Sequence, residues 1–330
     1  AGYEFSDTAE FYTFGSYGVR DGNGAGFYRR SSDVRNRDWA ASTTTFVPIY
    51  ADGFLPLIAS NIVDISAAAG LRGATGGWDY DLSAVYGSNR LDYTIKNSVN
   101  TSLGGAASAR SFDAGGLRSG QTSINLDMRR DLDIGIGKSV SFAFGGEYRN
   151  ENYKIVAGEL QSYVNGPFSA TPFKAAGGSQ VFPGFRPANE TDLSRDSFAG
   201  YAELDADLTD QLTLQLAGRY EHFSDFGDTI NGKAAARYEV IDGIAVRGSI
   251  STGFRAPSLA QQSFAATSTN NVGGVLIEVG TFPVSSPVAI ALGAQPLKPE
   301  KSINLGAGIT FMPFSGLSIT ADYYNIKIND

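Results

Sequence analysis

Residues 243–255, GIAVRGSISTGFR, carry the pattern that decides the fold of this chain. Apolar side chains at Ile244, Val246 and Ile250 alternate with polar or very small ones such as Arg247. Successive side chains of a β-strand point to opposite faces, so this alternation separates an apolar set from a polar set. The stretch therefore predicts a strand with one apolar and one polar face.

The same two-residue rhythm recurs over most of the 330 residues, for example in QLTLQLAGRYE at 211–221. Helical periodicity is nowhere comparably strong. Besides a partial strand at Tyr3–Phe5, the rhythm predicts eleven strands, near 9–20, 61–73, 76–95, 118–134, 139–155, 195–208, 211–225, 229–241, 243–255, 299–313 and 316–329. Many of these are longer than the five or six residues, roughly, of a strand in a globular protein.

Short and long connections between these strands alternate. The short ones have the residues of tight turns, as in Ile241-Asp242-Gly243. The long ones cover 21–60, 96–117, 156–194 and 256–298, and one intervening joint, at 224–228, is short. In an up-and-down meander, alternate joints lie at opposite ends of the sheet. One end therefore has short turns and the other long loops, which is typical of an outer-membrane barrel.

Composition excludes several classes of protein. The chain has no cysteine and one histidine, which removes disulfide scaffolds, thiolate metal sites and most histidine-based catalytic sites. A net charge of -8 disfavours a nucleic-acid partner. No apolar run is long enough for a membrane-spanning helix.

Long alternating strands with asymmetric loops predict an all-β fold, a transmembrane antiparallel up-and-down β-barrel. Lipid requires every backbone N–H and C=O group to be paired, which a closed sheet achieves. A polar face suits a wet lumen and an apolar face suits lipid. A soluble antiparallel sandwich would also alternate, but the strand lengths and long loops favour the membrane.

Five stretches, in order along the chain, resemble barrel segments of TonB-dependent outer-membrane receptors. They are FAFGGEYRNENY at 142–153, LAGRYEHFSDFGDTINGKAAARYEV at 216–240, RGSISTGFRAPSL at 247–259, LKPEKSINLGAG at 297–308 and ADYYNIKIND at 321–330. The likeness is most specific from about residue 139 onward. Earlier residues fit by strand rhythm more than by motif.

The resemblance implies a plugged barrel of roughly 22 strands, of which residues 1–330 would form about half, as one partial barrel domain. It also implies the Gram-negative outer membrane, with its lipid as surroundings, and active uptake of a scarce nutrient such as a ferric siderophore. The inner-membrane TonB complex would drive uptake through an N-terminal plug and TonB box. We expect the plug, the TonB box and the final strands to lie outside this chain.

The first long loop contains the first candidate ligand-binding residues, Tyr28, Arg29, Arg30 and Trp39. Arginine forks beside aromatic rings suit an anionic planar ligand, such as a ferric catecholate complex. The alternative is a solvated loop whose charges are balanced by nearby aspartates.

Two further candidates, Arg219 and Arg255, lie on the predicted polar face near strand ends. The hairpin at 209–211 predicts that Tyr201 faces Arg219 and that Glu203 lies near Ala217. Such residues also fit a barrel wall that holds a plug or ordered water.

Nothing in the sequence indicates an enzyme, a metal site or a cofactor. Paired acids such as Asp205 and Asp207 share the polar face, but no nucleophile accompanies them. The lone His222 fits a surface position at a loop edge. Competing functions are a passive porin, a carbohydrate or cobalamin receptor of the same family, and a structural or adhesin barrel.

Overall fold

A computed structural model describes residues 1–6, 8–135, 137–272 and 275–329. One antiparallel sheet of 12 strands dominates it, ordered as in the chain except that β10 pairs with β13. Its strands are β1 (Gly2–Ser6), β2 (Ala9–Ala25), β3 (Leu57–Thr75), β4 (Trp78–Lys96), β5 (Phe112–Leu132), β6 (Ser139–Val156), β7 (Thr191–Asp207), β8 (Leu212–Phe223), β9 (Gly227–Ile241), β10 (Ile244–Arg255), β13 (Glu300–Phe314) and β14 (Leu317–Asn329).

Smaller elements lie in the connections. They are the hairpin β11 (Ala266–Val272) and β12 (Val275–Thr281), the helices α1 (Leu160–Tyr163), α2 (Leu259–Ser263) and α3 (Pro287–Ala291), and the 3-10 turns η1 (Val34–Asn36), η2 (Thr101–Leu103) and η3 (Pro187–Asn189). No helix in the described part of the chain is both long and apolar enough to cross a membrane.

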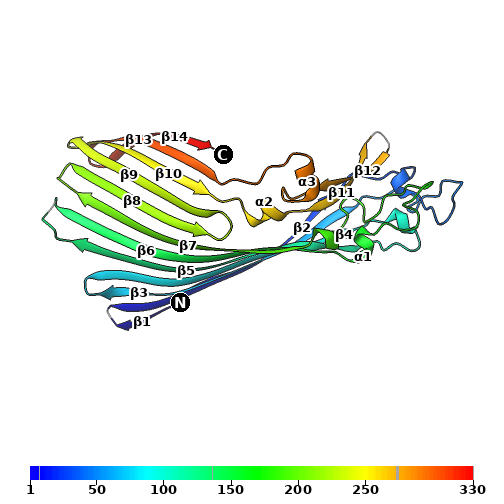
Figure 1. Ribbon diagram of the computed structural model, residues 1–330, viewed down its shortest axis with the longest axis horizontal. Helices are drawn as coiled ribbons and strands as arrows, with labels where there is room; N and C mark the ends of the chain where they lie inside the picture. The colour runs from blue at the N-terminus through cyan, green and yellow to red at the C-terminus, as the bar shows by residue number, and fades with distance from the viewer. Residues whose placement is uncertain (7, 136, 273–274, 330) are drawn as a thin grey trace.

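Figure 1 shows the tight turns at one end of the sheet and the long connections gathered at the other. The predicted up-and-down topology and the partial first strand are therefore confirmed. The sheet is open, with β1 and β14 as its edges, so within the described residues it does not close into a barrel. This half-barrel matches the expected fold class.

The two faces of the sheet differ as predicted, and we call them the apolar face and the polar face. The apolar face leaves large hydrophobic side chains exposed, among them Leu82, Leu126, Leu204, Leu216, Ile250 and Ile309. On the polar face, neighbouring strands are joined by side-chain bonds, such as that from Gln215 to Glu203 at 2.6 Å. A water-soluble monomer rarely exposes so much contiguous apolar surface, whereas lipid requires it.

Aromatic side chains border the apolar face near the turn end. The Trp78 ring lies 5.4 Å from that of Phe144, and the Arg130 guanidinium lies 5.8 Å from the centre of the Trp78 ring. Nearer the loop end, the rings of Tyr148 and Phe198 are 4.9 Å apart. Such rings fit the belts that aromatic residues form at the two membrane interfaces.

Strands β2, β3 and β5 extend further toward the loops than the alternation predicts, and at the loop end of β2 to β6 the polarity of the two faces inverts. On the polar face, Ile95, Ile155 and Phe112 are fully buried. On the opposite face, Lys154 and Asp192 form an ion pair at 3.0 Å. A strand of 19 residues such as β4 exceeds the roughly 9–11 residues that cross the hydrocarbon. We infer that this part of the sheet stands above the membrane, in water, and that loops cover its inner side.

Candidate functional site

The loops at 26–56, 97–111 and 157–190, here called the loop cluster, pack together around two small apolar cores. One core is formed by Ile95, Phe112 and Ala114, and the other by Tyr153, Ile155, Phe185 and Leu259. Rings of Phe182 and Phe185, 5.4 Å apart, connect the two cores with Tyr93. Because burial of apolar surface holds these loops to the strands, they form a fixed wall above the sheet.

Buried polar side chains tie the loops to one another. Asn100 is fully buried and donates to the carbonyl oxygens of Gln161 and Val164 at 3.0 and 2.9 Å. The Ser98 hydroxyl donates to the Gln180 carbonyl at 3.0 Å and accepts from the Gln180 amide at 2.8 Å. Each bond joins two different loops, so the geometry of one loop depends on the others.

The candidates of the first loop lie in different surroundings. Arg29 is only 5% exposed, and it donates to the Phe27 carbonyl at 2.6 Å and to Gln180 Oε1 at 3.2 Å. Burial lowers the pKa of the Arg29 guanidinium. The Tyr28 hydroxyl donates to the Asp52 carbonyl, whereas Arg30 is exposed. Arg29 therefore holds the first loop to Gln180 of the loop cluster, whereas the Arg30 side chain faces solvent.

Trp39 belongs to a stack of aromatic rings and one guanidinium. Arg37 lies 3.6 Å from the centre of the Trp39 ring, and the Phe173 ring packs edge-on against Trp39 at 5.4 Å. The Trp39 indole nitrogen and Arg37 Nε are both buried without a hydrogen-bond partner. Two buried donors in one stack make this a polar point at which an acceptor would be favourable.

A neighbouring carboxylate supports this loop and gives it a dependence on pH. Asp33 accepts bonds from the Arg35 backbone at 2.9 Å and from the Arg35 side chain at 2.6 Å. Burial alone would raise the pKa of Asp33, but the bonds from Arg35 outweigh it and lower the pKa.

We expect the local stability that Asp33 provides to be complete at neutral pH and to fall only below the pKa of an exposed aspartate. The sign follows because a carboxyl whose folded-state pKa is depressed stabilises the fold when ionised. Hydrogen exchange of residues 26–56 in the intact receptor, corrected for the intrinsic effect of pH on exchange, measures the transition. Asp33→Asn should remove it, and an unchanged acid transition in that variant would contradict the assignment.

On the polar face, the register confirms that Tyr201 pairs with Arg219 and Glu203 with Ala217. Arg219 lies 3.2 Å from Glu221 and 3.6 Å from Glu147. Arg219 is thus fixed between two carboxylates in the wall.

Arg255 ends β10 and lies 3.9 Å from Glu300, with 69% of its side chain exposed. It borders a cavity of about 370 Å³ between residues 256–261 and 295–300. Of the predicted candidates on this face, Arg255 has the more exposed side chain. The structure does not bring Arg255 together with the candidates of the first loop.

Sequence reasoning missed Arg195, which is the most connected side chain on the polar face. It donates to Glu151 at 2.6 Å and to the Pro257 carbonyl at 2.9 Å, and lies 3.6 Å from Asp225. Arg195 is 5% exposed. The signal in the sequence that could have indicated its role is that Arg195 is the single basic residue of the β7 segment TDLSRDSFAGYAELDAD.

Through Arg195, the segment after β10 is held across the polar face; we call residues 256–265 the strap. Leu259 of α2 packs on Tyr153 and is 5% exposed. Gln262 donates to Asp225 at 3.0 Å. The strap thus contacts the polar face through Leu259 and the loop cluster through the Phe264 ring, which lies 6.2 Å from that of Phe185.

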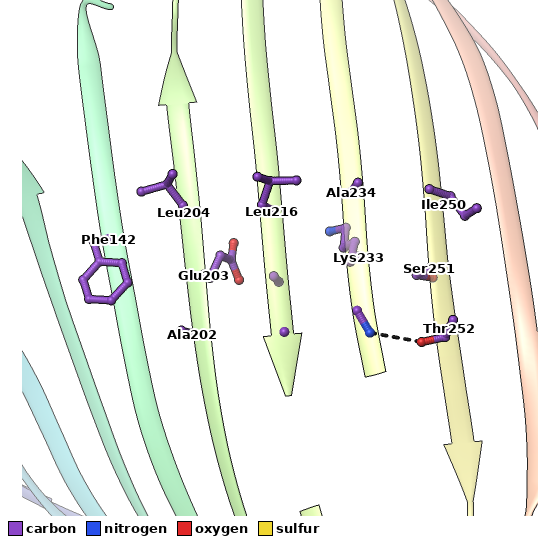
Figure 2. A pocket seen from close by; sticks show the side chains of 13 residues that line it. Phe142, Ala202, Glu203, Leu204, Leu216, Lys233, Ala234, Ile250, Ser251 and Thr252 are labelled. Atoms are coloured by element: carbon purple, nitrogen blue, oxygen red, sulfur yellow. Dashed lines mark hydrogen bonds between the residues drawn. The ribbon is translucent and has the colours of Figure 1, made fainter. Parts of the chain in front are cut away.

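Figure 2 shows a different hollow, of about 540 Å³, in the middle of strands β6 to β10. Apolar side chains such as Phe142, Leu204, Leu216 and Ile250 surround small residues including Ala202 and Ala234. The amide of Gly232 donates to the Thr252 hydroxyl at 3.0 Å, where the pairing of β9 with β10 ends. Because the large side chains belong to the apolar face, acyl chains would fill this hollow in a membrane.

The acidic residues and the histidine of the described residues form no candidate metal site. No group of three or more His, Asp or Glu side chains among them could hold a metal ion. His222 Nδ1 lies 2.7 Å from Asp228 Oδ1, and half of the His222 side chain is exposed. The Asp207 carboxylate accepts from Ser139 and Thr213. These contacts fit structural roles.

An open half-barrel with an apolar outer face, a charged inner face and a packed loop cluster defines a segment of an outer-membrane receptor. The family model for the β-barrel of TonB dependent receptor-like proteins matches residues 2–330, so the chain belongs to this family. The family is found in the outer membrane of Gram-negative bacteria.

Relatives and solved structures agree with this assignment. An iron-regulated outer membrane virulence protein of Vibrio cholerae is 27% identical over 142 residues, which are 42% of this chain and 19% of that protein. The siderophore receptor PirA from Acinetobacter baumannii has a TM-score of 0.56 at 13% identity, covering 99% of this chain and 48% of PirA. The structure of the RagAB peptide transporter has a TM-score of 0.61 at 10% identity. The match covers 99% of this chain and 39% of the RagAB chain.

The chain thus spans about half of PirA and about two fifths of the RagAB structure, and its match covers about a fifth of the curated relative. At such low identity the solved structures share the fold alone.

Proposed function

We propose that the intact protein imports a ferric siderophore across the outer membrane. The observation that carries this proposal is the fixed loop cluster above a polar-lined half-barrel, a preformed entrance to a wet lumen. A passive pore needs no such packed entrance. The iron-regulated relative from Vibrio cholerae supports iron as the cargo.

In this proposal the energy comes from the inner-membrane TonB complex, which reaches the receptor through a plug and TonB box outside this chain. Outer-membrane lipid surrounds the apolar face. Residues Tyr28, Arg30, Trp39 and Arg255 are the candidates for ligand contact, whereas Arg29 and Arg219 position the walls, because their side chains are held by other protein groups.

Deletion of the whole gene should impair growth under iron limitation and abolish uptake of a radiolabelled ferric complex. Collapse of the proton-motive force should have the same effect on uptake, because the transport is energy-coupled. Unchanged iron uptake, together with loss of a sugar, cobalamin or peptide, would reject the siderophore assignment. Uptake that survives loss of the proton-motive force would instead indicate a passive porin.

A further inference from the structure

The polar face holds many charges, yet nearly all of its cations are neutralised. Every arginine on this face in the described residues has a carboxylate within 4.0 Å, namely Arg20, Arg72, Arg129, Arg149, Arg195, Arg219, Arg237, Arg247 and Arg255. Lys233 is the exception among the described basic residues of this face. A paired guanidinium has already used its charge and much of its donor capacity.

A cavity of about 510 Å³ lies between the strap and the polar face of β3 to β6. Its size is within the range, about 300–1,000 Å³, of small-molecule sites. The strap contributes Ser258, Leu259 and Ala260. The sheet contributes mainly uncharged hydrogen-bonding side chains from its polar face, which are Ser66, Asn89, Ser119 and Gln121.

The cavity has no free cation. Its lining residues with ionisable side chains are Glu151 and the tyrosines Tyr86 and Tyr153, none of which is a cation. Arg195 holds Glu151 at 2.6 Å, and Asp225 lies 3.6 Å from the same guanidinium. Two carboxylates around one arginine leave this corner with a net negative charge, which repels an anion.

The first loop offers little more for an anionic ligand. Arg29 is buried, Arg35 is bound to Asp33, and Arg37 is stacked on Trp39. Arg30 is the remaining exposed guanidinium of that loop in the described structure. Recognition of a multiply charged anion favours several converging guanidinium groups, and these side chains do not converge.

We infer that the cargo of this receptor is an uncharged ferric complex that binds in the cavity beneath the strap. Three monoanionic bidentate ligands of the hydroxamate type neutralise Fe³⁺, whereas three catecholates leave a trianion. Amide and hydroxyl groups of the cavity can bond the oxygens of a neutral complex, and Leu259 can cover its apolar parts. This inference rests on the proposed function and names the cargo more narrowly.

The test uses the intact receptor, purified in detergent and titrated with two probes. One is an uncharged ferric trihydroxamate and the other a trianionic ferric tricatecholate. Quenching of intrinsic fluorescence reports binding. We expect the uncharged complex to bind at least about tenfold more tightly, and with little dependence on salt, because no long-range charge attraction contributes. Equal affinities, or tighter binding of the trianion, would overturn the inference.

Cavity variants locate the site. Gln121→Leu should weaken the uncharged complex by about tenfold, the loss expected for one hydrogen bond in a desolvated site. Gln215→Leu is the matched control, because Gln215 lies on the same face but outside this cavity and bonds Glu203. Equal effects of the two substitutions would contradict a site beneath the strap.

A substitution of opposite sense checks the charge argument. Ser119→Arg places a guanidinium in the cavity at a position whose cross-strand partners, Asn89 and Tyr153, carry no carboxylate, and it should improve binding of the trianionic complex relative to the wild type. No gain, in a variant whose native heat-modifiable form is retained, would count against the cavity. If neither complex binds and deletion leaves iron uptake unchanged, the proposed function fails as well. Tighter binding of the trianion would overturn the inference that the cargo is uncharged, but it would leave the proposed siderophore import standing.

Discussion

Replacement of Arg195 by methionine is expected to release the strap from the polar face. The substitution keeps much of the side-chain volume but leaves Glu151 and Asp225 without their cation, and the Pro257 carbonyl without its donor. Removing one partner of a buried ion pair costs about 3–5 kcal/mol, and we expect a value toward the lower end here because Glu151 and Asp225 keep 27% and 24% of their side chains exposed. The loss should therefore be large.

Hydrogen exchange of residues 256–265 in the intact receptor measures this effect. Exchange there should rise sharply, while strands β8 to β10 stay protected. Arg247→Met is the matched control, because Arg247 pairs with Asp322 on the same face but both side chains are substantially exposed. An exposed pair contributes only about 0–1 kcal/mol. Unchanged exchange in the strap of the Arg195 variant would show that α2 is held by Leu259 alone.

The sequence was sufficient for the topology, the two faces and the register of the β7–β8 hairpin. Each rests on local alternation and turn chemistry, and a slip by one residue would have moved Leu216 to the polar face. The pairing of Tyr201 with Arg219 followed directly from this rule.

Alternation failed where the surroundings of the sheet change. Beyond the membrane, water surrounds the outer side and the loop cluster covers the inner side, so Ile155 is buried on the polar face and Lys154 is exposed on the other. A rule that assigns apolar residues to lipid cannot recognise this inversion. The sequence therefore predicts strand β6, but it does not predict which side of the loop end of β6 is buried. The β11–β12 hairpin lies within the long connection 256–298, where the sequence predicts no strand.

The candidate site was predicted only in part, for a related reason. The sequence gives no reason to distinguish Arg29 from its neighbour Arg30, yet Arg29 is buried and Arg30 is exposed. The difference depends on Gln180, which is 151 residues away in the chain. Arg195 likewise acquires its role from a strap 62 residues later. Contacts of such separation leave no periodic signal in a single sequence.

Substitution of Leu216 by arginine should destabilise the intact receptor in a bilayer by about 2–4 kcal/mol, the cost of an arginine on the lipid face of a barrel near the midplane. Leu216 leaves 54% of its surface uncovered by protein and lies on the apolar face of β8. Its chain neighbour Gln215 points to the opposite, polar face and bonds Glu203. Gln215→Arg should therefore cost far less, because its guanidinium meets water and a carboxylate.

The comparison is made by urea unfolding of both variants in lipid vesicles, where the two positions differ by one residue and by face alone. If the sheet stood in water, an arginine at either exposed position would change stability by only a few tenths of a kcal/mol. A larger loss for Gln215→Arg than for Leu216→Arg would reverse the faces, and with them the placement of Arg195, the strap and the cavity inside the receptor. The sign of one difference in unfolding free energy thus decides on which side of the wall the cargo travels.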